Sequence, residues 1–322
     1  PIVSLIDEKI GAKIALLKSL TNILWAPLSK NLEGISLSAN WMWPTKNKGE
    51  NTRLFHAVKS ISDFAISLGI NIPTGKDSLS MIQKYPNNAS VQSPGTVIIS
   101  AVGEVDEVNN VVSPNLKKVV DSDILYIGTS KNLALGGSAF YQTLGKIGGV
   151  LPDILNSNDI KNVFNTIQKL IKENKILSGH DVSAGGLITT LLEMNFSNID
   201  YGMELDFKEF KEKDLLTILF NESPGIVIQI DKTTSKNLID SNINVIKLGK
   251  PIPERSLLIK HKDVNAKLDI DHFRDVWFKT SHLLDNFQTK KKYSIQRFKN
   301  YKNQPLKYTF PKEFSGKISD LK

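Results

Sequence analysis

Residues 74–81 carry side chains of the types that handle phosphate and metal ions. Lys76, Asp77 and Ser78 follow Gly75, directly after a short apolar run. A glycine lets the backbone approach a ligand, a lysine neutralises phosphate, a carboxylate can hold Mg²⁺, and serines donate hydrogen bonds. The glycine spacing is not that of a Walker A phosphate loop. A turn capped by Asp77 is the alternative interpretation, so this segment alone does not decide the chemistry.

Two more segments place glycines ahead of a predicted helix. One is residues 135–139, and the other, residues 178–187, contains Asp181, Ser183, Gly185 and Gly186. Glycines at a helix N-terminus present N–H groups suited to anions, and Asp181 and Ser183 would then lie beside phosphate oxygens. An ordinary N-capped turn explains each segment as well.

Several other chemistries find no support in the sequence. The absence of cysteine excludes disulfides, thiolate metal sites and a cysteine nucleophile. The five histidines include no pair four residues apart, which argues against zinc, and no GxSxG elbow is present. The tryptophans of residues 37–44 are interpreted as packing residues, and His56 as a packed or surface histidine.

The apolar patterns predict the elements that would position these segments. A spacing of three and four residues predicts helices, and β-branched runs predict strands, of which 96–105 reads as buried. The predicted helices are 7–22, 51–68, 159–174 and 185–196, with another opening after 133–139; the predicted strands are 69–73, 96–105, 123–128, 225–230, 244–248 and 256–260. Pro114 marks a domain boundary, and the apolar pattern ends after Leu284.

Composition narrows the class of protein. A chain of 322 residues with 40% hydrophobic and 23% charged residues suits a globular protein of two domains. No run of 18 apolar residues predicts a membrane-spanning helix. The net charge of +8 is carried by residues 289–322, and only four of the 41 basic residues are arginine. Because specific phosphate and base readers favour arginine, we expect no nucleic-acid partner.

Taken together and in this order, the segments resemble the phosphoribosylformylglycinamidine synthase family, the large multidomain formylglycinamide ribonucleotide amidotransferases. The resemblance covers nearly all of residues 1–285. It is carried by LTN at 20–22, LSANWM at 37–42, GINIPTGKDSLSM at 69–81, SPGTVIISAVGEV at 93–105, LGGSA at 135–139, GHDVSAGGLITTLLEM at 179–194 and LFNESPGIVIQI at 219–230.

The resemblance implies a fold of mixed α+β and α/β type, like that of aminoimidazole ribonucleotide synthetase. Residues 1–113 would form an α+β subdomain, incomplete at its start, that pairs into a shared barrel. Residues 114–285 would form an α/β subdomain, and residues 286–322 a basic linker toward a glutaminase domain. The chain would be the second synthetase half of a larger cytoplasmic polypeptide, with the first half and the glutaminase as its partners.

The resemblance also implies an activity and a set of ligands. The family is a carbon–nitrogen ligase of purine biosynthesis, which uses ATP and glutamine to convert a formylglycinamide ribonucleotide to its amidine. This half would bind ATP or ADP with Mg²⁺. A free-standing ATP-dependent kinase or synthetase of the same fold, and a catalytically silent half that only holds a nucleotide, are the alternatives.

Matched residue by residue, Asn22 and Asp181 are implied Mg²⁺ ligands and Ser183 a nucleotide contact. Asp77 is expected to bind metal or phosphate beside Lys76 and Ser78, and the Gly185-Gly186 pair to bind nucleotide; no catalytic residue is assigned. Two departures stand out: Lys18 occupies the position of a metal-binding glutamate in the family, and a further aspartate ligand would lie before Pro1. We therefore expect weak Mg²⁺ retention, with the Lys18 ammonium standing in as the countercharge to phosphate.

Overall fold

The computed structural model describes residues 2–212 and 214–303. The chain divides into two compact units, Pro1–Asp271 and His272–Lys322, which are described separately. None of the described helices is both long enough and apolar enough to cross a membrane.

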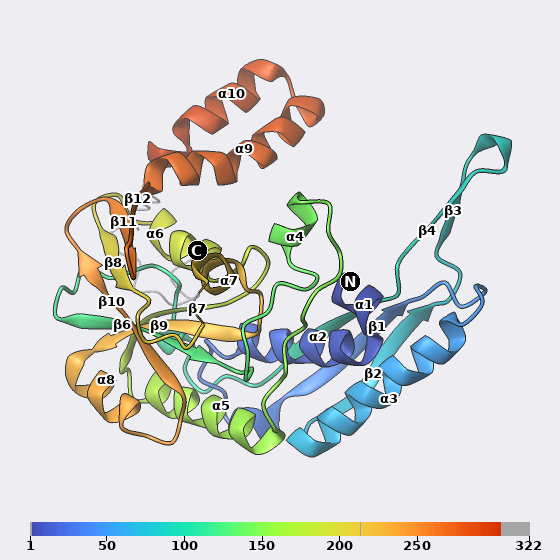
Figure 1. The fold of residues 1–322 in the computed structure, drawn as a ribbon, viewed down its shortest axis with the longest axis horizontal. Helices are drawn as coiled ribbons and strands as arrows, with labels where there is room; N and C mark the ends of the chain where they lie inside the picture. Colours follow the sequence, from blue (N-terminus) through green and yellow to red (C-terminus); the bar gives the residue numbers. More distant parts are fainter. Residues whose placement is uncertain (1, 213, 304–322) are drawn as a thin grey trace, which may run out of the picture. The chain divides into compact units, whose positions relative to one another are not determined.

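The first unit begins with a small sheet of order β2-β1-β5 (Figure 1). β1 (Ser36–Met42) is its central strand, parallel to β2 (Asn71–Ser78) and antiparallel to β5 (Thr96–Val102). Helices α2 (Glu8–Ile23) and α3 (Glu50–Leu68) pack against each other, and α2 also packs on β5. The remaining elements here are α1 (Ile2–Ile6), η1 (Asn31–Gly34), β3 (Ile82–Lys84), η2 (Pro86–Asn88), β4 (Ser90–Gln92) and η3 (Val108–Asn110).

Both helices predicted for this region are confirmed, and their ends have local causes. Asp7 caps α2, because its side chain accepts hydrogen bonds from the backbone N–H groups of Lys9 and Ile10, each 2.9 Å long. α3 ends at Gly69, whose left-handed φ of 74° suits glycine.

Two strand predictions need correction. The strand expected at 69–73 continues to Ser78, so the segment expected as a loop pairs with β1 along the edge of the sheet. Pro73 is tolerated because β2 is an edge strand and the register shifts beside it. The strand at 96–105 ends at Val102 and is not buried throughout, since Ile98 is 52% exposed and Val102 67% exposed.

A seven-stranded sheet of order β12-β11-β8-β10-β6-β9-β7 follows. The predicted strands at 123–128, 225–230, 244–248 and 256–260 are confirmed as parts of β6 (Ser122–Gly128), β9 (Gly225–Asp231), β10 (Val245–Ile252) and β11 (Ser256–His261). The predicted helices are found as α4 (Ala139–Thr143), α5 (Ser157–Lys172) and α6 (Gly186–Phe196). Sequence patterns did not predict β7 (Ile176–Asp181), β8 (Gly202–Asp206), α7 (Leu215–Phe220), α8 (Lys232–Ile239) or β12 (Val264–Asp269).

Gln168 of α5 joins the two sheets' regions through a fully buried amide. Its Nε2 donates to the carbonyl oxygens of Leu24 at 2.6 Å and Ala26 at 2.9 Å, and its Oε1 accepts from the N–H of Leu28 at 2.8 Å. These three backbone groups belong to the segment that leaves α2. Gln168 therefore fixes the position of α2 relative to the larger sheet.

His180 ties the end of β7 to α6. Its Nδ1 lies 2.9 Å from the carbonyl oxygen of Asp181 and 3.5 Å from that residue's carboxylate, and its Nε2 lies 3.2 Å from the carboxylate of Glu193. Burial by itself would lower the pKa of His180, but the hydrogen bonds and charges of Asp181 and Glu193 raise it to about 9. The imidazolium form is thus the one that the fold stabilises.

The second unit is a helical hairpin in its described part. Most of α9 (Ile270–Gln288) lies in it, followed by α10 (Lys291–Asn300) and η4 (Tyr301–Asn303). Arg297 forms a two-bond ion pair with Asp285, and Phe278 stacks on Tyr301 with ring centroids 3.9 Å apart. The linker expected from residue 286 onward is therefore helical up to Asn300, while residues 304–322 of that linker lie outside the described residues.

We expect Gln168→Leu to destabilise the first unit by about 3 kcal/mol or more, because it leaves three backbone groups without their partner. Urea denaturation followed by tryptophan fluorescence measures the loss. Gln83→Leu, at an exposed position, is the matched control and should change stability by less than about 0.5 kcal/mol. Equal effects of the two substitutions would contradict the role of Gln168.

The raised pKa of His180 predicts a pH-dependent contribution to stability. Because the pKa rises from 6.5 in the unfolded chain to about 9, the contribution is complete below about pH 6.5 and is lost as the pH rises through 9. The free energy of unfolding of the parent should exceed that of His180→Gln by about 3 kcal/mol more at pH 6 than at pH 10. A difference that stays constant over this range, measured by urea denaturation, would refute the assignment.

Candidate functional site

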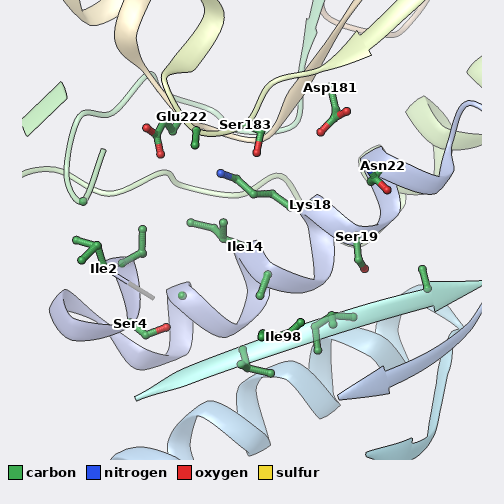
Figure 2. Close-up of a pocket in the computed structure, with 18 of the residues that line it drawn as sticks. Ile2, Ser4, Ile14, Lys18, Ser19, Asn22, Ile98, Asp181, Ser183 and Glu222 are labelled. Atoms are coloured by element: carbon green, nitrogen blue, oxygen red, sulfur yellow. The ribbon is translucent and has the colours of Figure 1, made fainter. Parts of the chain in front are cut away.

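A cavity of about 870 Å³ lies between α2, the edge of β5 and three loops of the larger sheet. The loops contribute Gly137, Asp181, Ser183 and Glu222, and β5 contributes residues 97–101. Figure 2 shows α2 crossing the cavity, with Lys18 and Ile14 directed toward the loops. The first unit therefore brings residues from distant parts of the sequence around one space.

α2 contributes its cavity residues through helical periodicity. Ile14, Lys18 and Asn22 follow at intervals of four residues and so occupy one face. Leu17 and Leu20, on the other side, are buried in the core. Gly11 allows α1 to close one end of the cavity, since a Cβ at this position would come within 2.3 Å of the Ser4 hydroxyl.

Asp181 enters the cavity from the carboxyl end of β7, and Ser183 follows two residues later. Only 14% of the Asp181 side chain is exposed. Burial raises the pKa of this carboxyl group, but the hydrogen bond and charge of His180 outweigh it and hold the pKa below its ordinary value. Asp181 is therefore a fixed anion at the cavity wall.

Glu222 joins the two glycine-rich loops. Its Oε1 accepts hydrogen bonds from the N–H of Ala139, the first residue of α4, at 2.7 Å and from the N–H of Gly185 at 2.9 Å. Gly185 and Gly186 both have left-handed φ angles, of 86° and 76°. A Cβ on Gly186 would come within 2.6 Å of the Phe220 backbone, so these glycines let the loop pack against the turn that carries Glu222.

Lys18 supplies the positive charge among these anions. Of the described residues that line the cavity, Lys18, Asp181 and Glu222 carry charge. Burial lowers the pKa of Lys18, while the charges of Glu222 and Asp181 act in the opposite direction. In Figure 2 its ammonium group points toward Ser183 and Glu222.

The structure brings only some of the predicted site residues together. Asn22, Asp181 and Ser183 line the cavity with Lys18, and Gly185 is tied to its wall by Glu222. Lys76, Asp77 and Ser78 are not among the lining residues of this cavity. They lie on β2, which β1 separates from β5, and Lys76 hydrogen-bonds Ser78.

Glu222 is a charged residue of the cavity that sequence analysis did not select. It follows Asn221 in the loop before the buried strand β9. Its side chain accepts hydrogen bonds from two backbone N–H groups that are distant in the sequence. The only available signal was a carboxylate placed between an apolar helix and a Ser-Pro-Gly turn, which is too common a pattern to indicate a site.

The oxygen donors in the cavity do not fit a resident Mg²⁺ ion. Asn22 and Asp181 offer one amide oxygen and one carboxylate, and the second carboxylate, Glu222, already accepts two backbone hydrogen bonds through its Oε1, so water or a phosphate would have to supply most of the six oxygen ligands of Mg²⁺. Among the described residues, no group of three or more His, Asp or Glu side chains could hold a metal ion. The Lys18 ammonium, which has no lone pair, points into the same space.

Comparison with known proteins identifies related sequences over most of the chain. Residues 1–104 match the family described as FGAR-AT PurM_N-like domain, and residues 120–239 match the AIR synthase related protein, C-terminal domain. The probable phosphoribosylformylglycinamidine synthase of Caenorhabditis elegans is 34% identical over 314 residues, which cover 91% of this chain and 23% of the relative. The human phosphoribosylformylglycinamidine synthase is 32% identical over 298 residues, 89% of this chain and 22% of the relative.

Solved structures agree on the fold. Thermotoga maritima PurL complexed with FGAR has a TM-score of 0.65 at 12% identity, covering 85% of this chain and 44% of that one. The hydrogenase maturation protein HypE has a TM-score of 0.57 at 14% identity, covering 80% and 81%. The expected aminoimidazole-ribonucleotide-synthetase-like fold is thus confirmed. Over most of its length the chain is therefore similar to phosphoribosylformylglycinamidine synthases, and it spans about a fifth of the length of the curated relatives that it matches.

Proposed function

We propose that this chain is the nucleotide-holding second synthetase half of a formylglycinamide ribonucleotide amidotransferase, and that ATP or ADP binds in the cavity beside α2. The observation that carries the proposal is the meeting of Asn22, Asp181 and Ser183 with Lys18 around one space of about 870 Å³. Relatives solved with ATP and with ADP support an adenine nucleotide as the ligand class.

The reaction proposed for the whole enzyme is an ATP-dependent amide-to-amidine conversion. ATP phosphorylates the amide oxygen of the formylglycinamide ribonucleotide, and ammonia released from glutamine displaces the phosphate. In this chain, Lys18 would neutralise phosphate charge and Ser183 would donate a hydrogen bond to a phosphate oxygen. Asp181, held by His180, would fix the orientation of the lysine. We place this enzyme in the cytoplasm.

We propose that a partner domain of the same enzyme contacts this chain at β5. Among the described residues this strand pairs along one edge only, with β1, and Ile98 and Val102 are more than half exposed. An unpaired edge carrying apolar side chains is stabilised when another sheet covers it. We propose the first synthetase half as that sheet, and the glutaminase as the source of ammonia.

A catalytically silent half is the second candidate, and Lys18 favours it. Phosphoryl transfer requires metal ions to offset the charge that develops on the phosphates, and among the described residues no group of three or more acidic or histidine side chains could hold them. In that case the nucleotide would stabilise this half without turning over.

We expect the 322-residue chain alone to form no amidine with ATP and either glutamine or ammonia. Addition of the first synthetase half of the same enzyme should restore ammonia-dependent activity, measured as amidine product by mass spectrometry. Product formed by this chain alone would overturn the proposal that it is one half of the site.

ADP at 100 times its dissociation constant should stabilise the chain by about 2.7 kcal/mol. The melting temperature, followed by differential scanning fluorimetry, should then rise by roughly 5 to 10 °C. Ser183→Ala should weaken ADP binding about tenfold through the lost hydrogen bond to phosphate. Ser197→Ala, at the far end of α6, is the control and should bind ADP like the parent; an equal loss in both variants would contradict the role of Ser183.

A further inference from the structure

The position of Lys18 is fixed by the fold. It lies within α2, whose opposite face is buried through Leu17 and Leu20, and the segment after the helix is held by Gln168. Its side chain is half-buried in the cavity and points toward the loops of the larger sheet. The fold therefore fixes the face of α2 from which the Lys18 side chain enters the cavity.

The two carboxylates around Lys18 are fixed as well. Glu222 is held by two backbone N–H groups, and Asp181 contacts the imidazole of His180. Among the described residues that line the cavity, Lys18 is the one cation beside these two carboxylates. The ammonium group therefore already supplies a positive charge in the space that a metal ion would enter.

A divalent cation would have to share this space with the ammonium group. It would approach the Lys18 ammonium, which repels it, and would have to compete for the Glu222 oxygen already bonded to Ala139 and Gly185. A phosphate, in contrast, gains a direct partner in the ammonium and adds no cation to the space.

We propose that the Lys18 ammonium takes the place of a divalent cation in this cavity, so that the site binds a nucleoside diphosphate or triphosphate without Mg²⁺. The proposal rests on the nucleotide site proposed above and deepens it by naming the metal-free form of the nucleotide as the ligand.

The first test needs no nucleotide. Mn²⁺ binding to the 322-residue chain is measured by electron paramagnetic resonance for the parent, Lys18→Glu and Lys9→Glu. The parent should bind no Mn²⁺ in this cavity. Lys18→Glu should gain one site, because it places a third carboxylate beside Asn22, Asp181 and Glu222. Lys9 lies on α2 about half a turn out of phase with Lys18, so Lys9→Glu should gain none.

The second test measures ADP affinity by titration calorimetry in EDTA and in excess Mg²⁺. The parent should bind ADP with affinities that differ by less than about threefold between the two conditions. Lys18→Met should lose about tenfold or more, Lys18→Arg should keep most of the affinity, and Lys9→Met should match the parent.

The outcomes separate the two proposals. Binding of Mn²⁺ by the parent at the cavity, or ADP binding that requires Mg²⁺, overturns the role of Lys18. So does unchanged ADP affinity in Lys18→Met. If the parent binds no ADP in either condition, the proposed nucleotide site fails, and the gain or absence of Mn²⁺ binding in Lys18→Glu still decides whether Lys18 occupies the place of the cation.

Discussion

The buried amide of Gln168 is the interaction on which the cavity depends. It satisfies three backbone groups of the segment after α2, and the bonds to Leu24 and Leu28 are buried. If this segment shifted, its N–H and C=O groups would lose their partners in an apolar interior. The segment therefore holds α2 at a fixed position and at a fixed rotation about the helix axis. Leu17 and Leu20 then remain in the core, and Lys18 remains directed into the cavity.

The same principle holds the loops opposite α2. One oxygen of Glu222 joins two loops that are distant in the sequence, and the left-handed glycines before α6 let the backbone approach that turn. In many phosphate sites such backbone N–H groups face the ligand. Here a protein carboxylate already occupies two of them, so in the proposed nucleotide site the Lys18 ammonium is the group that would meet a phosphate.

The small sheet has an open edge that suits the larger assembly proposed above. β5 has one paired edge among the described residues, and its outer side carries exposed aliphatic groups while its inner side packs on α2. The cavity lies along this strand. A sheet placed against β5 would therefore also complete a wall of the proposed nucleotide site, which couples assembly to ligand binding.

The sequence alone determined the features that depend on local periodicity and on short motifs. Helices α2, α3, α5 and α6 and strands β6 and β9 were predictable, because burial of one helix face or of a whole strand leaves a regular apolar pattern. Asn22, Asp181 and Ser183 were selected through the family resemblance, and helical spacing placed Lys18 on the same face as Asn22. The tertiary structure decided which motifs meet. Lys76, Asp77 and Ser78 looked equally suited to phosphate, but the strand order puts β1 between them and the strand that lines the cavity. Glu222 joined the site through bonds to two distant backbone groups, and α10 formed from a weakly apolar segment because His282 and Asp285 of α9 contact Phe298 and Arg297. Such contacts depend on distance in space, which no periodic pattern along the chain records.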